Sequence, residues 1–197
     1  MLNRYIVKEH RYTVMEKTVM NVLEAIEKRR SIRKYEKKAI DRQSMEILKE
    51  AALRSPSSRG INPWTFIFVD DPDVLKKLSG TREHGSDQLK GAALAIVVCG
   101  DETKSDVWIE DCTIAAIGLH FTAHSLGLGS CWSQMRNRTH SNEKTAEAYV
   151  QELLGIPKNL RVESIIGIGF PAETKTPVPA DKLDYKKINC NRYGKTF

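Results

Sequence analysis

The sequence lacks closely spaced cysteines, and this excludes several kinds of site. Its four cysteines, Cys99, Cys112, Cys131 and Cys190, form no C-x-x-C pair and have no histidine at metal-ligand spacing. A zinc or iron–sulfur centre is therefore not expected. Cys99 lies in a run typical of a buried strand and Cys112 in a run typical of a helix, so both are expected to be unreactive core thiols in a reducing compartment.

Long apolar runs are also missing. No segment is long enough to span a membrane, and residues 1–18 mix polar and charged side chains where a secretory signal would be apolar. Met15 and Met20 both precede the first clear helical pattern. We therefore expect a cytoplasmic protein with no membrane partner, in which residues 1–19 form a translational extension or a frayed, disordered arm.

Charge of one sign is nowhere strongly concentrated. The net charge is +6, but the 31 Lys and Arg residues are spread along the chain among 25 Asp and Glu residues. This dispersion argues against a nucleic-acid partner. The densest basic run, residues 28–34, is short and suited to holding one phosphate group.

Recognisable sets of catalytic side chains are absent too. No Ser/His/Asp set and no paired carboxylates stand out, which favours a reaction carried out by a bound cofactor. His120 and His124 have metal-ligand spacing but no third ligand, so no metal is predicted there. The glycines of residues 167–171 run into Pro171 instead of a third glycine and a helix, and no Rossmann dinucleotide site is predicted.

The sequence does contain clear helical and strand patterns. Periodicity, caps and breakers predict helices over residues 21–30, 44–54, 72–78, 106–126 and 141–154, and strands over residues 64–69, 92–99 and 162–168. The helix over 106–126 is apolar almost all round, which is typical of a helix buried in a core or an interface. With no regular βαβ repeat and no internal period, these patterns predict a single α+β domain over residues 20–197, layered around a central sheet.

The first candidate binding motif is Arg-Arg-Ser-Ile-Arg at residues 29–33, where the first helix ends. Three guanidinium groups and a hydroxyl within five residues can hold a dianionic phosphate through charge-assisted hydrogen bonds. A solvated basic helix end, favourable to the helix dipole, explains the same residues. The motif alone leaves both interpretations open.

Two further motifs contain groups that suit a planar ligand. Residues 56–64 read Pro-Ser-Ser-Arg-Gly-Ile-Asn-Pro-Trp, in which the Asn62 carboxamide matches the alternating N–H and C=O edge of a pyrimidine-like ring. Residues 127–134 read Gly-Leu-Gly-Ser-Cys-Trp-Ser-Gln, where glycines allow close backbone approach and N–H groups can face an electron-rich ring. An ordinary turn is the better explanation of the first segment taken alone, and a helix C-cap with Trp132 in the core is the alternative for the second.

Taken in this order, the three motifs resemble those of the nitroreductase superfamily. The resemblance runs from about Val22 to the C-terminus and includes residues 167–173 and the closing Asn-Arg-Tyr at residues 191–193. It implies a three-layer α+β fold with a central mixed, mainly antiparallel sheet flanked by helices. It also implies a homodimer with two FMN molecules at the interface, the long helix in that interface, and a C-terminal tail that wraps the partner subunit.

The resemblance assigns roles to individual residues. The FMN phosphate and ribityl chain would be held by Arg29, Arg30, Ser31 and Arg33. The partner subunit would contribute Pro56, Ser57 and Ser58, and Asn62 would meet the pyrimidine edge of the flavin. The segment that would lie along the flavin face and its reactive nitrogen consists of Cys131, Trp132, Ser133 and Gln134.

The tail departs from the family pattern. Many members have two basic tail residues that complete the phosphate site, and Ala180 replaces one of them here. Lys182 is expected to be the basic tail residue that remains.

The implied activity is ping-pong hydride transfer from NADH or NADPH, through FMN, to a small-molecule acceptor such as a nitroaromatic, a quinone or an enone. Alternatives within the family are a reductive dehalogenase or a flavin-consuming enzyme, which share the cofactor site. A basic binding protein without flavin is the alternative from another class. Arg136 and Arg138 follow the third motif and suggest an anionic acceptor or the nicotinamide phosphates.

Overall fold

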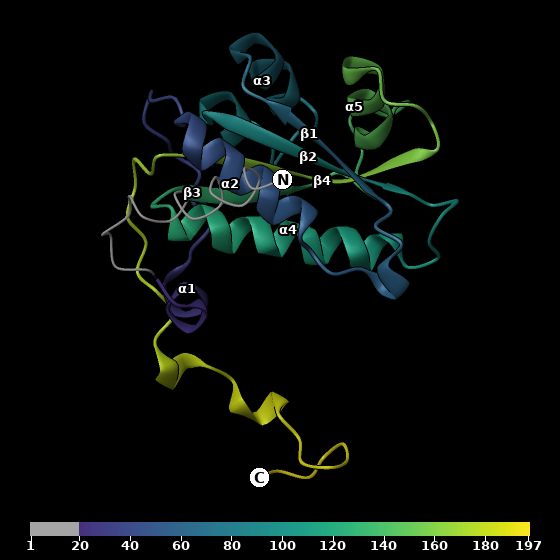
Figure 1. Cartoon of the computed structure of the whole chain (residues 1–197). Coiled ribbons are helices and arrows are strands. Elements are labelled where there is room, and N and C mark those ends of the chain that lie inside the picture. The colour runs from purple at the N-terminus through teal and green to yellow at the C-terminus, as the bar shows by residue number, and fades with distance from the viewer. Residues whose placement is uncertain (1–19) are drawn as a thin grey trace, which may run out of the picture.

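The computed structural model describes residues 20–197, so the predicted extension over residues 1–19 lies outside the described part. A four-stranded sheet lies between two layers of helices (Figure 1). The helices α2 (Arg42–Leu53) and α4 (Trp108–Ser125) cover one face. The helices α3 (Pro72–Ser79) and α5 (Ala146–Leu154) cover the other, which confirms the predicted three-layer α+β architecture.

The sheet contains β1 (Trp64–Val69), β2 (Leu94–Asp101), β3 (Gly129–Gln134) and β4 (Leu160–Gly169) in the order β1-β2-β4-β3. All three strand pairings are antiparallel. The parallel component of the expected mixed sheet is limited, in the described chain, to one isolated bridge between Ser31 and Ser130.

The hydrophobic core has two halves, one on each face of the sheet. Alternate residues of β2 serve both, because successive side chains of a strand point to opposite faces. Ile96 and Val98 pack with Leu119 of α4, whereas Val97 packs with Leu78 of α3. Such a strand is buried on both faces, as its continuous apolar sequence predicts.

Most helices begin at the polar side chains that cap them. Asn21, Asp41 and Thr145 each accept a hydrogen bond from a backbone N–H in the first turn of α1 (Val22–Lys28), α2 and α5. The cap at Thr145 shows that α5 begins at residue 146 and not, as predicted, at residue 141. Residues 139 and 145 form a bridge, which keeps the intervening chain out of the helix.

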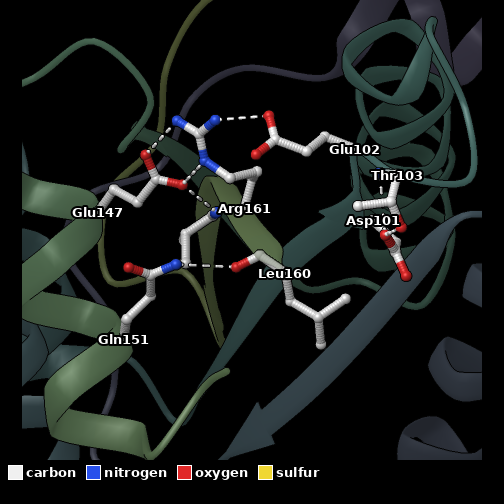
Figure 2. Close-up of polar contacts among 8 residues, drawn as sticks. Asp101, Glu102, Thr103, Glu147, Gln151, Leu160 and Arg161 are labelled. Carbon is white, nitrogen blue, oxygen red and sulfur yellow. Dashed lines mark hydrogen bonds and ion pairs between the residues drawn. The ribbon is translucent and has the colours of Figure 1, made fainter. Parts of the chain in front are cut away.

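A network around Arg161 fastens α5 to the sheet (Figure 2). The Arg161 guanidinium donates to both oxygens of Glu147, at 2.7 and 2.9 Å, and to Glu102 at 2.7 Å. Glu147 also accepts the Val162 backbone N–H at 2.9 Å, and the Gln151 amide donates to the Leu160 carbonyl oxygen at 3.0 Å. These bonds hold the first two turns of α5 and the start of β4 together with Glu102, which directly follows β2.

One side of α4 is left without cover in the protomer. Ile114 and Ile117 are 41% and 40% exposed, and the apolar side chains of α1, Val22, Leu23 and Ile26, are exposed as well. The tail beyond residue 176 extends past α1 and away from the sheet (Figure 1). It contains the short 3-10 turns η4 (Ala180–Lys182) and η5 (Tyr185–Lys187). Among residues 20–197 no helix has the length and apolar character that crossing a membrane requires.

Candidate functional site

The first and third sequence motifs lie side by side in the structure. The chain leaves α1 and runs along the free edge of β3, where the Ile32 N–H donates to the Ser130 carbonyl oxygen at 3.0 Å. Gly129 makes this approach possible, because a Cβ atom at Gly129 would lie only 2.7 Å from the Cβ of Ile32. Strand β3 itself was not predicted, since residues 127–134 were interpreted as a ligand-binding loop or a helix cap.

Two side chains that the sequence did not identify clamp the same segment. The Glu173 carboxylate accepts the backbone N–H groups of Arg33, at 2.5 Å, and Lys34, at 3.2 Å. The Arg33 N–H is the main reason that the pKa of Glu173 is lowered. On the other side, the Tyr35 hydroxyl donates to the Ile32 carbonyl oxygen at 2.6 Å and lies 3.1 Å from that of Gly167. The first motif therefore has a fixed path over the sheet edge.

Three basic side chains gather near the Cys131 thiol on β3. Burial raises the pKa of Cys131, while the positive charges of Arg33, Lys175 and Arg29 oppose this rise. Arg30 has another role in the protomer, because its guanidinium donates to the Thr176 carbonyl oxygen at the start of the tail.

The structure brings Lys175, and not Lys182, to this cluster. Lys182 belongs to η4, on the part of the tail that extends away from the sheet. Lys175 lies 3.6 Å from Glu173 in an ion pair. No local sequence pattern distinguishes Lys175, because its position depends on how the chain turns in the six residues after β4.

The residues of β3 differ in what their side chains can offer. Ser133 is fully buried, and its hydroxyl accepts a hydrogen bond from the Gln88 amide at 2.6 Å and donates to the Gly85 carbonyl oxygen at 3.1 Å. The Trp132 indole N–H donates to the Gln134 side-chain oxygen at 3.0 Å. The polar side chains of this strand are thus largely engaged within the protein.

The backbone of β3 is more available to a ligand. In an antiparallel pair, alternate residues direct their N–H and C=O groups towards the neighbouring strand and away from it. The Ser130 carbonyl oxygen faces the free edge, where it accepts the Ile32 N–H. The backbone groups of Trp132 and Gln134 therefore face the same free edge.

His120 lies behind this edge on α4. Its Nδ1 atom is 2.7 Å from the Ser130 hydroxyl, and its ring stacks on Trp132 with 6.3 Å between centroids. Burial, with a smaller contribution from Arg29, lowers the pKa of His120 to about 4. His120 is therefore neutral at physiological pH, and no cluster of three metal-ligating side chains occurs among the described residues.

The second motif forms a compact loop before β1. The Ser57 hydroxyl lies 2.6 Å from the Asn62 side-chain oxygen and accepts the Asn62 backbone N–H at 2.9 Å. Asn62 has a positive φ of 52°, a left-handed conformation that asparagine tolerates well. The Ser58 N–H donates to Asp111 at 2.8 Å, and this contact fixes the loop, including the exposed Pro56, to the first turn of α4.

Within one protomer this loop does not meet the other two motifs. It contacts Asp111, whereas Arg29 lies near His120 and His124 in the last turns of α4. Asp111 and His124 are 13 positions apart, which corresponds to about 20 Å along a helix. The second motif therefore lies at the opposite end of α4 from Arg29 of the first motif.

Comparison with known proteins identifies the family. The model of the nitroreductase family matches residues 26–81 and 80–170. An FMN-dependent nitroreductase from Clostridium difficile is similar in structure, with a TM-score of 0.85 and 44% identity over 87% of this chain and 99% of that chain. A protein from Archaeoglobus fulgidus, provisionally named NADH dehydrogenase/NAD(P)H nitroreductase, is 38% identical over 81% of this chain and 90% of its own length.

A more distant similarity links the chain to a dehalogenating enzyme. An iodotyrosine deiodinase from Haliscomenobacter hydrossis is 25% identical over 79% of this chain and 66% of its own length. The family match covers most of the described chain, and the relatives with the higher identities are oxidoreductases by name. The chain belongs to the nitroreductase family and is an oxidoreductase.

Proposed function

We propose that this protein is an FMN-dependent oxidoreductase that takes hydride from NADH or NADPH and passes it to an acceptor such as a nitroaromatic, a quinone or an enone. The main supporting observation is the group of basic side chains around Cys131, beside the free edge of β3. The name of the C. difficile relative, an FMN-dependent nitroreductase, supports the same cofactor.

The chemistry of this edge suits a phosphorylated cofactor. Arg29, Arg33 and Lys175 bring three positive charges to this place and Glu173 brings one negative charge, and the net excess of two positive charges matches a dianionic phosphate. The Ser31 hydroxyl lies on the same segment and adds a neutral donor. In this proposal Lys175 takes the role that the sequence suggested for Lys182.

When bound, FMN supplies the two-electron chemistry, in two half-reactions that the nicotinamide and the acceptor enter in turn. The chain binds and orients the reactants. The outward N–H groups of Trp132 and Gln134 would donate hydrogen bonds to an electron-rich ring and stabilise negative charge there. The neutral His120, fixed between Ser130 and Trp132, supports the strand from behind.

The proposed site is shared between two copies of the chain in a homodimer. Ser57, Ser58 and Asn62 lie too far from the basic cluster to join it in one protomer, so the partner supplies them. The uncovered apolar side of α4, the exposed side chains of α1 and the extended tail form the surface on which that partner would pack.

The test is whether the purified protein binds and reduces flavin. We expect a yellow protein that releases FMN on denaturation and bleaches under anaerobic NADH or NADPH. Replacing Arg33 or Lys175 with Ala should weaken FMN binding at least tenfold, whereas Arg42→Ala, at the exposed start of α2, should not. A colourless protein retained on nucleic acid in a salt-sensitive manner would contradict the proposal and favour a basic binding protein.

Reductive dehalogenation is a second candidate, favoured by the similarity to iodotyrosine deiodinase. The two activities use the same proposed cofactor and differ in the product. With 3-iodotyrosine and a reductant, a dehalogenase releases iodide, whereas the favoured function gives reduction of a nitroaromatic or quinone and little iodide. Comparing the two turnover rates on one preparation separates the candidates.

A further inference from the structure

A second group of arginines lies at the end of β3, apart from the basic cluster around Cys131. Arg82 belongs to the loop between α3 and η3 (Asp87–Gly91), and Arg138 to the turn that follows β3. The Arg82 Nη1 atom donates to the Gln134 carbonyl oxygen at 3.2 Å. Arg82 therefore lies at the free edge of β3, the strand that is proposed to lie along the flavin.

The loop that contains Arg82 is fixed by neutral hydrogen bonds. The Ser133 hydroxyl donates to the Gly85 carbonyl oxygen, and the Gln88 amide donates to the Ser133 hydroxyl. The His140 ring lies 2.9 Å from the Thr81 carbonyl oxygen. The position of the Arg82 guanidinium is thus determined by its loop and not by an acidic partner.

Among the described residues, the two guanidinium groups interact electrostatically and have no paired carboxylate. Burial lowers the pKa of Arg82, and the positive charge of Arg138 lowers it further. Among residues 20–197 neither Arg82 nor Arg138 forms an ion pair with a carboxylate. The Arg138 guanidinium reaches only the Asn137 carbonyl oxygen, at 3.4 Å.

Arg136, which the sequence grouped with Arg138, faces another group. Its charge lowers the pKa of the buried Glu163, so it already has an acidic neighbour. The arginines left without one are Arg82 and Arg138. Since a guanidinium has five N–H donors and Arg82 uses one of them on Gln134, most of its donors remain available.

We propose that Arg82 and Arg138 form an anion-binding subsite, which holds a carboxylate or phosphate group of a substrate of the flavin site. An anion placed between two guanidinium groups relieves their mutual repulsion and can accept bidentate hydrogen bonds. The anionic group comes either from the electron acceptor or from the nicotinamide dinucleotide. This inference rests on the proposed function, because it places the subsite beside the proposed flavin strand.

The experiment compares the FMN-loaded wild type with the variants Arg82→Met, Arg138→Met and the double variant. Each is assayed with 4-nitrobenzoate and with its neutral analogue 4-nitrobenzamide, and separately with NADH and NADPH. Arg42→Met removes one charge from an exposed site on α2 and is the matched control. Arg82→Lys keeps the charge and serves as the rescue variant if Arg82→Met disturbs the loop.

We expect the double variant to lose at least tenfold in kcat/KM for one anionic substrate, mainly through KM. If the acceptor supplies the anion, 4-nitrobenzoate is affected and 4-nitrobenzamide stays within twofold of the wild type. If the dinucleotide supplies it, the KM for NADH or NADPH rises and both nitro compounds keep their KM. Raising the salt concentration should weaken the binding of the same substrate to the wild type.

Two results overturn the inference, and they are distinguishable. Flavin-loaded variants that turn over every substrate within twofold of Arg42→Met contradict the anion subsite alone. A wild-type protein that neither binds FMN nor oxidises NADH or NADPH contradicts the proposed function, and the subsite with it.

Discussion

Glu163 is a buried carboxyl group that no side chain neutralises fully. It is 2% exposed, and its Oε2 atom has no hydrogen-bond partner among the described residues. Burial raises its pKa to about 7, and Ser164 and Arg136 only partly oppose this rise. At pH 6 the group is mostly protonated in the folded protein and ionised in the unfolded chain.

This raised pKa makes stability depend on pH. The folded state binds the extra proton between pH 4.5 and about 7, so the contribution of Glu163 is present below pH 4.5 and is lost as the pH rises through 7. The loss amounts to about 3 kcal/mol. Glu163→Gln removes it, and the difference in unfolding free energy between the variant and the wild type should grow in favour of the variant from pH 5 to pH 8.

Urea denaturation at several pH values measures this difference. His120 acts in the opposite direction, because its lowered pKa makes the folded state less stable as the pH falls from 6.5 towards 4. The two groups partly compensate in the wild type, so only the comparison with Glu163→Gln isolates the carboxyl group. A difference that does not change with pH would show that Glu163 titrates normally.

At the scale of elements, the contact between the first motif and β3 depends on one missing side chain. Gly129→Ala places a Cβ atom 2.7 Å from the Cβ of Ile32, and the segment over residues 29–33 must move away from the strand. We expect a loss of about 1–3 kcal/mol in stability and at least tenfold weaker FMN binding. Gly91→Ala is the control, since no atom lies within 4 Å of its added Cβ.

Flavin fluorescence titration and thermal unfolding of the two variants give the comparison. An unchanged FMN affinity in Gly129→Ala would mean that the path of residues 29–33 along β3 does not matter for the cofactor.

The Arg161 network predicts unequal effects for its members. Arg161→Met leaves Glu147, whose side chain is 12% exposed, without its charged partner, and should cost about 2 kcal/mol. Glu102 is 42% exposed, so Glu102→Gln should cost less than about 1 kcal/mol. Chemical denaturation of both variants checks the order, and equal losses would contradict the dominance of the Arg161–Glu147 pair.

The sequence predicted elements where local signals and burial agree. The strand over residues 64–69 has the predicted bounds, and the apolar run containing Val97 is a central strand. Strand β3 was missed because its glycine and two serines have little strand preference, and its partner β4 begins 26 residues after β3 ends. Pairing of this kind is decided by tertiary structure.

The candidate site shows the same limit. The sequence predicted its first and third motifs as separate segments, and the structure places them in contact. The clamp by Glu173 and the position of Lys175 depend on how the chain turns after β4, which no local pattern encodes. Of the arginine pair the sequence identified only Arg138, since Arg82 and Arg138 are 56 positions apart and interact only through the fold.

For the whole molecule, the uncovered side of α4 predicts an association that can be disrupted. Ile117→Glu puts a charge in the middle of the proposed dimer surface, where desolvation is costly. We expect monomers in sedimentation velocity and loss of bound FMN, because the loop over residues 57–62 of the partner is no longer supplied. Lys76→Gln, on α3 at the opposite face of the sheet, changes the net charge equally and should remain dimeric and yellow.

A variant Ile117→Glu that sediments as the wild type does would place the interface elsewhere. A stable monomer that keeps its FMN would contradict the sharing of the site between two chains.

The separation of the motifs along α4 means that two differently defective chains should complement each other. A chain carrying Arg33→Ala and a chain with its Ser57–Ser58 pair replaced by alanines are each defective in both sites of their own dimers. When the two are unfolded together and refolded, each hybrid particle has one site with both lesions and one site with none. Mixing the two defective preparations should thus restore up to about a quarter of the wild-type turnover, as random pairing makes half of the particles hybrid. Recovery of no activity from such a mixture would mean that each chain builds its site alone.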